Sequence, residues 1–469
     1  PFLNICKENH TAIRIGVNHG SLSDRIMSRY GDTPEGMVES CMEFLRICVA
    51  ENFTDVVISI KASNTVVMVK TVRLLVDVME KEGMAFPLHL GVTEAGDGED
   101  GRIKSALGIG ALLSDGLGDT IRVSLSEAPE AEIPVARKLV DYVLLRQEHP
   151  YIPGLEAPEF NYLSPERRKT KAVRNIGGEH VPVVIADRMD GKTEVNPEFT
   201  PDYIYAGRAL PEQREEGVEY ILDADVWQGE AGTWPAFNHA QLPLMGECDA
   251  ALKFLFIPYM AQTDEVIACL KYHPEVVIIS QSNHPNRLGE HRALVHQLMT
   301  EGLQNPVVFF QHYAEDDAEN LQIKSAADMG ALIFDGLCDG IFLFNQGSLS
   351  HAVVDATAFG ILQAGRTRTS KTEYISCPGC GRTLYDLEKT IARIKAATSH
   401  LKGLKIGIMG CIVNGPGEMA DADYGYVGAG RGKISLYKGK VCVEKNIPEE
   451  EAVERLLEFI RTDREENQQ

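Results

Sequence analysis

No long hydrophobic run occurs in the sequence. The apolar stretches are short, and one of the longest, residues 254–257, ends at Pro258. A membrane-spanning helix needs about 20 consecutive apolar residues, so we expect no such helix. The hydrophobic content of 44% over 469 residues is typical of a soluble globular chain with large cores and about three domains.

Positive charge is also scarce. The chain carries 46 Lys and Arg against 68 Asp and Glu, which gives a formal net charge of −22. An acidic surface repels nucleic acid and anionic membranes, so we expect neither as a partner. An anionic substrate would need a local basic pocket within this acidic protein.

Cysteine is too sparse for a secreted disulfide scaffold. Ten cysteines are spread over the chain, and most stand alone in apolar stretches, as Cys41, Cys48, Cys269 and Cys338 do. Isolated cysteines of this kind are usually small buried thiols. This usage fits a reducing compartment, and we expect a cytoplasmic location.

The first 150 residues alternate between strand and helix patterns. Strands are predicted at residues 12–17, 55–61, 87–93 and 119–125, and helices at 34–50, 65–82, 102–117 and 133–146. Pro34 suits the first position of its helix. Four consecutive βα units predict parallel strands joined by crossover helices.

The second region repeats the first. The Lys104-Ser-Ala segment recurs at Lys324, and Asn18-His recurs at Asn238, both at an offset of 220 residues. A constant offset indicates a duplicated βα domain. A barrel of eight βα units needs roughly 250 residues, so the first copy is expected to be the C-terminal half of a barrel that lacks its beginning.

Three domains are therefore predicted, in an α/β chain. Residues 1–148 would form the C-terminal half of a (βα)8 TIM-type barrel, and residues 149–370 an inserted, barrel-like duplicate. Residues 371–469 would form a small α+β domain with strands at 404–409, 433–437 and 441–444, flanked by helices at 384–397 and 449–461.

The last domain carries three cysteines in a distinctive setting. Cys377-Pro-Gly-Cys380 is followed by Cys411 in the segment Met409-Gly-Cys-Ile-Val-Asn-Gly-Pro-Gly-Glu418. Thiolates are soft ligands that select zinc or iron–sulfur, and the glycines leave room for a bulky cluster. A structural zinc site usually has a fourth Cys or His ligand. None lies nearby, which favours iron–sulfur and leaves one iron for another ligand.

These motifs resemble (E)-4-hydroxy-3-methylbut-2-enyl diphosphate synthases, in their larger three-domain form. The resemblance extends to the segments around Asn18, Lys61, Thr93-Glu94 and Arg122-Val-Ser124. It implies a [4Fe–4S] cluster held by Cys377, Cys380, Cys411 and Glu418, with Asn414 nearby; we also consider Arg382 near the cluster. The implied reaction is the reductive ring opening and dehydration of 2-C-methyl-D-erythritol 2,4-cyclodiphosphate. No nucleotide-binding fingerprint is present, so ferredoxin or flavodoxin is the expected electron donor.

The polar residues at the strand ends agree with this reaction. Function in a βα barrel sits at the carboxyl ends of the strands. Cations and hydrogen-bond donors gathered there suit a diphosphate, and Glu94 can donate a proton to a leaving hydroxyl. The expected substrate-binding residues are Arg14, Asn18, Lys61, Thr93, Arg122 and Ser124, and the expected catalytic acid is Glu94.

The second copy lacks this charged set. At the offset of 220, the following replacements occur: Arg14 by Trp234, Lys61 by Gln281, Glu94 by Ala314, Arg122 by Phe342 and Ser124 by Phe344. The inserted domain is therefore expected to be catalytically silent. Lys104 and Ser105 recur as Lys324 and Ser325, which indicates a structural role near a helix start. The retention of Asn18 as Asn238 leaves its role open.

Two other functions remain open on the residues alone. The chain could be an iron–sulfur electron-transfer protein without a substrate of its own, or a zinc-stabilised scaffold built from duplicated barrels. Binding of a small cyclic diphosphate would separate the enzyme from the first, and iron analysis would separate it from the second.

Overall fold

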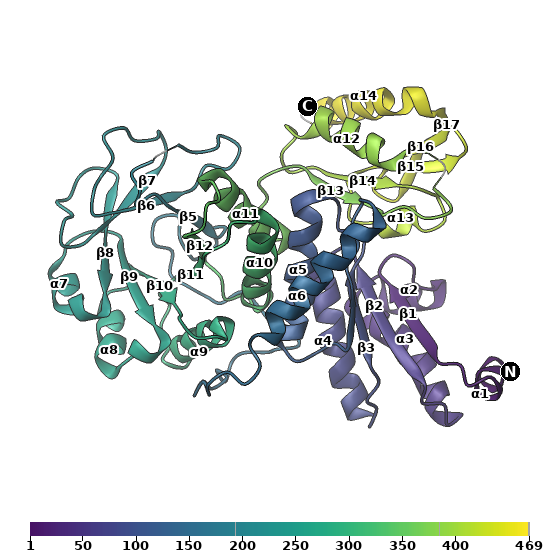
Figure 1. Cartoon of the computed structure of the whole chain (residues 1–469), viewed down its shortest axis with the longest axis horizontal. Helices are drawn as coiled ribbons and strands as arrows, with labels where there is room; N and C mark the ends of the chain where they lie inside the picture. Colours follow the sequence, from purple (N-terminus) through teal and green to yellow (C-terminus); the bar gives the residue numbers. More distant parts are fainter. Residues whose placement is uncertain (193, 384, 468–469) are drawn as a thin grey trace. The chain divides into compact units, whose positions relative to one another are not determined.

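The computed structural model describes residues 1–192, 194–383 and 385–467, which form two compact units. The first unit combines Pro1–Leu139 with Thr369–Gln469, and the second is Val140–Arg368 (Figure 1). The predicted limits of three domains, at residues 148 and 370, remain a prediction. Across the described part of the chain, no helix is both long and apolar enough to cross a membrane.

The first part of unit 1 is an open parallel sheet in the order β1-β2-β3-β4, which we call the barrel half. Its strands are β1 (Ile13–Asn18), β2 (Val56–Ala62), β3 (Leu88–Val92) and β4 (Thr120–Arg122). Its helices are α1 (Phe2–Glu8), α2 (Asp24–Tyr30), α3 (Pro34–Ala50), α4 (Thr65–Lys81), α5 (Gly98–Ser114), η1 (Pro129–Ala131) and the start of α6 (Glu132–Leu144). These are the four predicted βα units. Helix α3 has the predicted ends, since Thr33 caps it by accepting a hydrogen bond from Gly36 N–H.

Unit 2 is a closed parallel barrel of eight strands, which confirms the predicted α/β class. The strands are β5 (Val183–Asp187), β6 (Tyr203–Gly207), β7 (Glu219–Asp223), β8 (Thr233–Asn238), β9 (Lys253–Pro258), β10 (Val276–Gln281), β11 (Val307–Tyr313) and β12 (Gly340–Asn345). The helices are η2 (His239–Gln241), α7 (Leu242–Glu247), η3 (Tyr259–Ala261), α8 (Asp264–Tyr272), α9 (Arg287–Thr300), α10 (Ala318–Phe334) and α11 (His351–Ala364). Apolar side chains such as Phe254, Ile279 and Phe342 fill the barrel core. Two of these strands contain proline: Pro235 lies within β8, and Pro258 ends β9.

The strand register corrects the alignment of the two copies at β1. Asn18 pairs with Lys61 in the barrel half, whereas Gln281, the counterpart of Lys61, pairs with Pro258 on β9. The counterpart of β1 is therefore β9, and the predicted match of Asn18 with Asn238 on β8 is wrong.

The same register changes two further assignments. Arg14 corresponds to Phe254 rather than Trp234. Gly91 pairs with Arg122 in the first copy, and Phe310 pairs with Phe342 in the second. Arg122 and Phe342 are 220 positions apart, but Gly91 and Phe310 are only 219 apart, so the offset between β3 and β11 is one residue shorter. Continued to the strand end, this register places Tyr313, not Ala314, where the first copy has Glu94. The charge is still lost in the second copy at each position.

The C-terminal part of unit 1, which we call the cluster domain, is a five-stranded sheet in the order β13-β14-β15-β16-β17. The strands are β13 (Glu373–Ser376), β14 (Lys405–Met409), β15 (Tyr424–Gly430), β16 (Lys433–Lys438) and β17 (Val441–Pro448); the helices are α12 (Leu387–Thr398), α13 (Gly415–Glu418) and α14 (Glu449–Asn467). The first three strands are parallel, so their carboxyl ends share one edge of the sheet. Leu384, where a helix was predicted to begin, lies outside the described residues.

The sequence did not predict β13 or β15. Strand β15 contains three glycines, which usually weaken a strand. Here they are required: a Cβ on Gly425 would lie 2.4 Å from Met419 Cε, and one on Gly428 would lie 2.3 Å from the Gly410 carbonyl oxygen.

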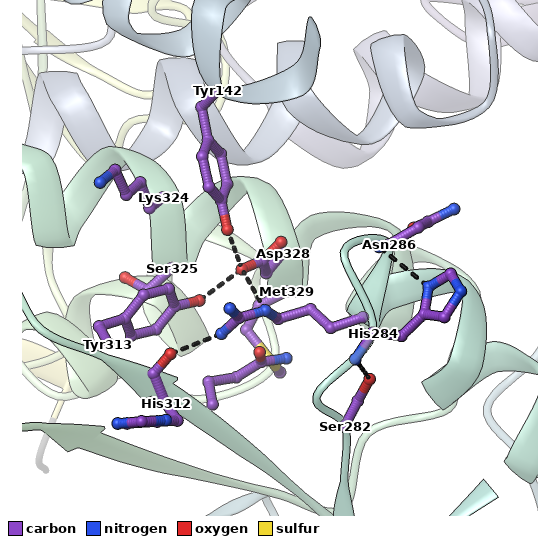
Figure 2. Close-up of polar contacts among 12 residues, drawn as sticks. Tyr142, Ser282, His284, Asn286, His312, Tyr313, Lys324, Ser325, Asp328 and Met329 are labelled. Carbon is purple, nitrogen blue, oxygen red and sulfur yellow. Dashed lines mark hydrogen bonds and ion pairs between the residues drawn. The ribbon is translucent and has the colours of Figure 1, made fainter. Parts of the chain in front are cut away.

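A buried polar cluster organises unit 2 around Asp328 on α10. The hydroxyls of Tyr142 and Tyr313 each donate to its carboxylate at 2.6 Å (Figure 2). Arg146 pairs with the same carboxylate, which is fully buried. Tyr142 and Arg146 belong to the end of α6 and the turn that follows it, so Asp328 fixes this segment against α10 and β11.

Candidate active site

Four residues form one row across the barrel half. The register pairs Asn18 with Lys61, Lys61 with Gly91, and Gly91 with Arg122. Gly91 has no side chain, and a Cβ there would lie 3.3 Å from Lys61 Cε and 3.1 Å from the Arg122 carbonyl oxygen. The row therefore leaves room for two cations beside one another at the carboxyl ends of the strands.

The surroundings of Lys61 disfavour the charged form of its amino group. Burial, together with the positive charges of Arg122 and Arg14, lowers the pKa of Lys61 to about 8. A site in which cations repel one another and are withdrawn from water favours an anionic ligand, because the ligand restores the missing negative charge.

Glu94 follows β3 in a backbone conformation that is unusual for a residue with a side chain, with φ of 49°. Its side chain is buried, and among the described residues its Oε2 has no hydrogen-bond partner. Burial, together with the neighbouring Glu418 carboxyl, raises the pKa of Glu94 to about 8. Glu94 is therefore protonated at neutral pH and can act as an acid.

The cysteines lie at the edge of the cluster domain where its parallel strands end. Cys377 follows β13, and Cys411 follows β14 by two residues. Cys377 Sγ accepts a hydrogen bond from Gly410 N–H at 3.2 Å, although burial raises the pKa of this thiol. The backbone N–H and the guanidinium of Arg382 lower the pKa of Cys380, which favours its thiolate.

One cavity of about 240 Å³ brings the two sides together. Its lining contains these predicted site residues: Asn18, Lys61, Thr93, Glu94, Arg122, Cys377, Cys380, Cys411, Asn414 and Glu418. Arg382 lines it too. Two predicted substrate residues do not: Arg14 is exposed on β1, and Ser124 is buried with its hydroxyl unpartnered among the described residues.

The donor set fits a polynuclear cluster better than a single ion. Three thiols and two carboxyl groups, those of Glu94 and Glu418, line the cavity, and within the described ranges no three His, Cys, Asp or Glu side chains are arranged to hold one metal ion. In a cubane cluster each ligand binds a different iron, so the ligands stand farther apart than those that share one zinc.

Sequence reasoning missed several residues that support the site. Thr383 Oγ1 accepts a hydrogen bond from Cys380 N–H at 3.1 Å, and Tyr385 donates to the Met409 carbonyl at 2.9 Å. Ser63 and Asn64 contact the segment that carries Glu418. The Lys61-Ala-Ser-Asn64 segment was a signal for the last two, but their partners lie more than 350 residues away.

The barrel half with its candidate acid and cations, joined to a cavity lined by three thiols, indicates an oxidoreductase of the iron–sulfur class. The comparisons with known proteins agree. The model of the GcpE TIM-barrel domain matches residues 1–137, and that of the GcpE protein C-terminal domain matches residues 373–462. The chain belongs to the 4-hydroxy-3-methylbut-2-en-1-yl diphosphate synthase family.

Several relatives carry the name 4-hydroxy-3-methylbut-2-en-1-yl diphosphate synthase (flavodoxin). The one from Bacteroides thetaiotaomicron is 95% identical over 466 residues, which cover 99% of this chain and 76% of the relative. One from Bacteroides fragilis is 84% identical, over 98% of this chain and 74% of the relative. One from Chlorobaculum tepidum is 41% identical, over 98% of this chain and 71% of the relative.

Proposed function

We propose that the chain catalyses the reductive ring opening and dehydration of 2-C-methyl-D-erythritol 2,4-cyclodiphosphate to (E)-4-hydroxy-3-methylbut-2-enyl diphosphate. The observation that carries this proposal is the shared cavity, which joins Lys61, Arg122 and Glu94 to three thiols and Glu418. The reaction takes up two electrons and two protons and releases water. The site must therefore hold a diphosphate, supply a proton and deliver electrons.

The barrel half holds the diphosphate. Lys61 and Arg122 pair with its phosphate oxygens, and Asn18 and Thr93 donate hydrogen bonds. Ser124 and Arg14 lie outside the cavity lining. Ser124 places a hydroxyl group at the end of its strand, and the charge of Arg14 makes the electrostatic potential around Lys61 more positive.

Glu94 is the proton donor. Its pKa of about 8 keeps it protonated at neutral pH, so it can transfer the proton from its carboxyl to the departing hydroxyl, which leaves as water. The ionised carboxylate that remains is buried next to Glu418, and it recovers its proton before the next turnover.

Cys377, Cys380, Cys411 and Glu418 of the cluster domain would hold a [4Fe–4S] cluster. The bound cluster supplies the electrons one at a time. Arg382 and Asn414 line the cavity beside these ligands, and the Arg382 guanidinium offsets the negative charge of the Cys380 and Cys411 thiolates.

The relatives' name points to flavodoxin as the electron donor, with ferredoxin as the alternative. We propose that the reaction takes place in the cytoplasm, where a reduced donor and free thiols coexist.

The test compares Glu94→Gln with Glu80→Gln, an exposed acid on α4 outside the cavity. Removing a general acid should lower kcat by about 10²–10⁴ while substrate still binds, and the control should keep full turnover. If the purified protein contains iron but does not bind the cyclic diphosphate, an electron-transfer function would be favoured. Purified protein with zinc instead of iron would favour a scaffold.

A further inference from the structure

Within unit 1, the cluster domain meets the barrel half through a buried ion pair. Lys104 on α5 pairs with Glu373 on β13 at 3.0 Å, and the two side chains are 7% and 6% exposed. Lys104 Nζ also donates to the Tyr374 carbonyl at 3.4 Å. Lys104 lies in the middle of α5 rather than near its start, so the helix-start role expected from sequence is wrong.

A second contact lies one residue before a cluster ligand. Ser126 Oγ donates to the Ser376 carbonyl at 2.9 Å, and the two hydroxyls are 2.8 Å apart. Ser376 also forms a parallel β-bridge with Ala95, the residue after Glu94. The chain leading into Cys377 is thus held in register with the residue that follows the catalytic acid.

The opposite side of the cavity is held in the same way. Ser63 Oγ donates to the Glu418 carbonyl at 3.1 Å, and Asn64 Nδ2 donates to Asp421 Oδ2 at 2.9 Å while its Oδ1 caps α4. Gly20 and Gly417 touch through their backbones, since a Cβ on Gly20 would lie 2.0 Å from the Gly417 carbonyl oxygen. Both the Cys377 and the Glu418 segments are therefore anchored to strand-end loops of the barrel half.

The outer rim of this contact is electrostatically complementary. The loop and first turn of α5 supply acids, and the cluster domain supplies lysines: Lys371 pairs with Glu99 and Asp100 at 2.6 and 2.7 Å, and Lys395 pairs with Asp97 at 2.5 Å. We call these pairs, with the Lys104, Ser126, Ser63 and Asn64 contacts, the docking seam.

The second copy shows that the Lys104 contact is not part of building a barrel. Lys324, at the equivalent place on α10, pairs with Glu315 of its own loop. By the register of β3 and β11, the residue that matches Glu315 is Gly96, so the first copy has no acid at that place. Lys104 therefore forms its ion pair with Glu373 of the cluster domain instead.

We propose that Lys104 and Ser126 are positioning residues, which touch neither substrate nor cluster. They determine where the cluster ligands lie relative to Glu94 and to the row of polar residues at the strand ends that would bind the diphosphate. This inference rests on the proposed cluster site. A displacement of about 1 Å in a reacting group can cost about 10²-fold in rate. Removing Lys104 takes a buried, oppositely charged partner away from Glu373, which loosens β13.

The test uses anaerobically reconstituted holoenzyme. Lys104→Met keeps the length of the side chain and removes the charge, and Lys324→Met is the matched control. We expect kcat to fall about 10–100-fold in Lys104→Met, with KM and iron content within about threefold of the parent. Lys104→Arg should recover most of the rate, and Lys324→Met should keep it.

Hydrogen–deuterium exchange supplies a readout that does not depend on turnover. Amides of residues 373–376 should exchange faster in Lys104→Met, and in the milder Ser126→Ala, but not in Lys324→Met. The proposal is overturned if the Lys104 variant matches its control in rate and exchange, or if KM rises as much as kcat falls. The exchange comparison also works on iron-free protein, so it stands apart from any failure of the proposed function.

Discussion

The carboxyl groups of Glu94 and Glu418 line the same cavity and interact with each other, one from the barrel half and one from the cluster domain. Their proximity contributes to the raised pKa of Glu94. The residue proposed to give the proton thus lies beside the residue proposed to bind the fourth iron.

Replacing Glu418 with Ala should produce a labile cluster that loses iron, because no other carboxylate is offered by the described cavity lining except Glu94. Turnover should fall by at least about 10–100-fold. Iron and sulfide analysis with electron paramagnetic resonance would measure the loss. Glu454→Ala on α14, an exposed acid paired with Arg393, is the control and should change neither. An intact cluster with full turnover in Glu418→Ala would exclude Glu418 as the ligand.

Substrate affinity should decline as pH rises through about 8. The pKa of Lys61 is lowered from 10.5 to about 8, so Lys61 loses its charge there, while a cyclic diphosphate keeps its own charge. Binding should be measured in the Glu94→Gln background, which removes the other group that titrates near pH 8. The dissociation constant should rise about tenfold per pH unit above 8.

Lys61→Arg should abolish this pH dependence, because a guanidinium stays charged. Gln281→Ala, at the equivalent place in the second barrel, should leave the profile unchanged, as expected of a catalytically silent domain. A pH limb that persists in Lys61→Arg would assign the titration to another group.

The active site should be complete within one chain. Glu94 and the cysteines line one cavity inside one compact unit. A mixture of Glu94→Ala and Cys411→Ala proteins should therefore be as inactive as either alone. Restored turnover on mixing, measured against protein concentration, would show that chains share their sites.

Removing the Asp328 carboxylate should destabilise unit 2 strongly. Asp328→Ala removes the buried carboxylate that Arg146 and two tyrosine hydroxyls contact, which should cost about 3–5 kcal/mol of unfolding free energy. The two tryptophans, Trp227 and Trp234, both lie in this unit, so their fluorescence reports its urea unfolding.

The control for this change is Glu301→Ala. It breaks the exposed pair with Lys271 at 3.1 Å and should cost no more than about 1 kcal/mol. Equal losses in the two variants would show that the Asp328 cluster adds nothing beyond a surface pair.

Local sequence determined much of this protein. Periodicity and capping residues defined α3 from Pro34 to Ala50, because Thr33 and Pro34 start a helix by short-range geometry. The cysteine and glycine motif defined the metal-site candidates for the same reason: ligand identity and turn chemistry are written in a few adjacent residues.

Only tertiary structure decided the rest. That β9, not β8, is the counterpart of β1 depends on strand pairing, since a sequence offset carries no information about which strands are neighbours. Strand β15 exists because Gly425 and Gly428 make room for Met419 and for the Gly410 backbone. The partner of Lys104 is 269 positions away, at Glu373, whereas Lys324 pairs with Glu315 of its own loop. Contacts between distant segments form only when both segments are folded. The sequence therefore shows which chemical groups are present, whereas the tertiary structure determines which of them are in contact.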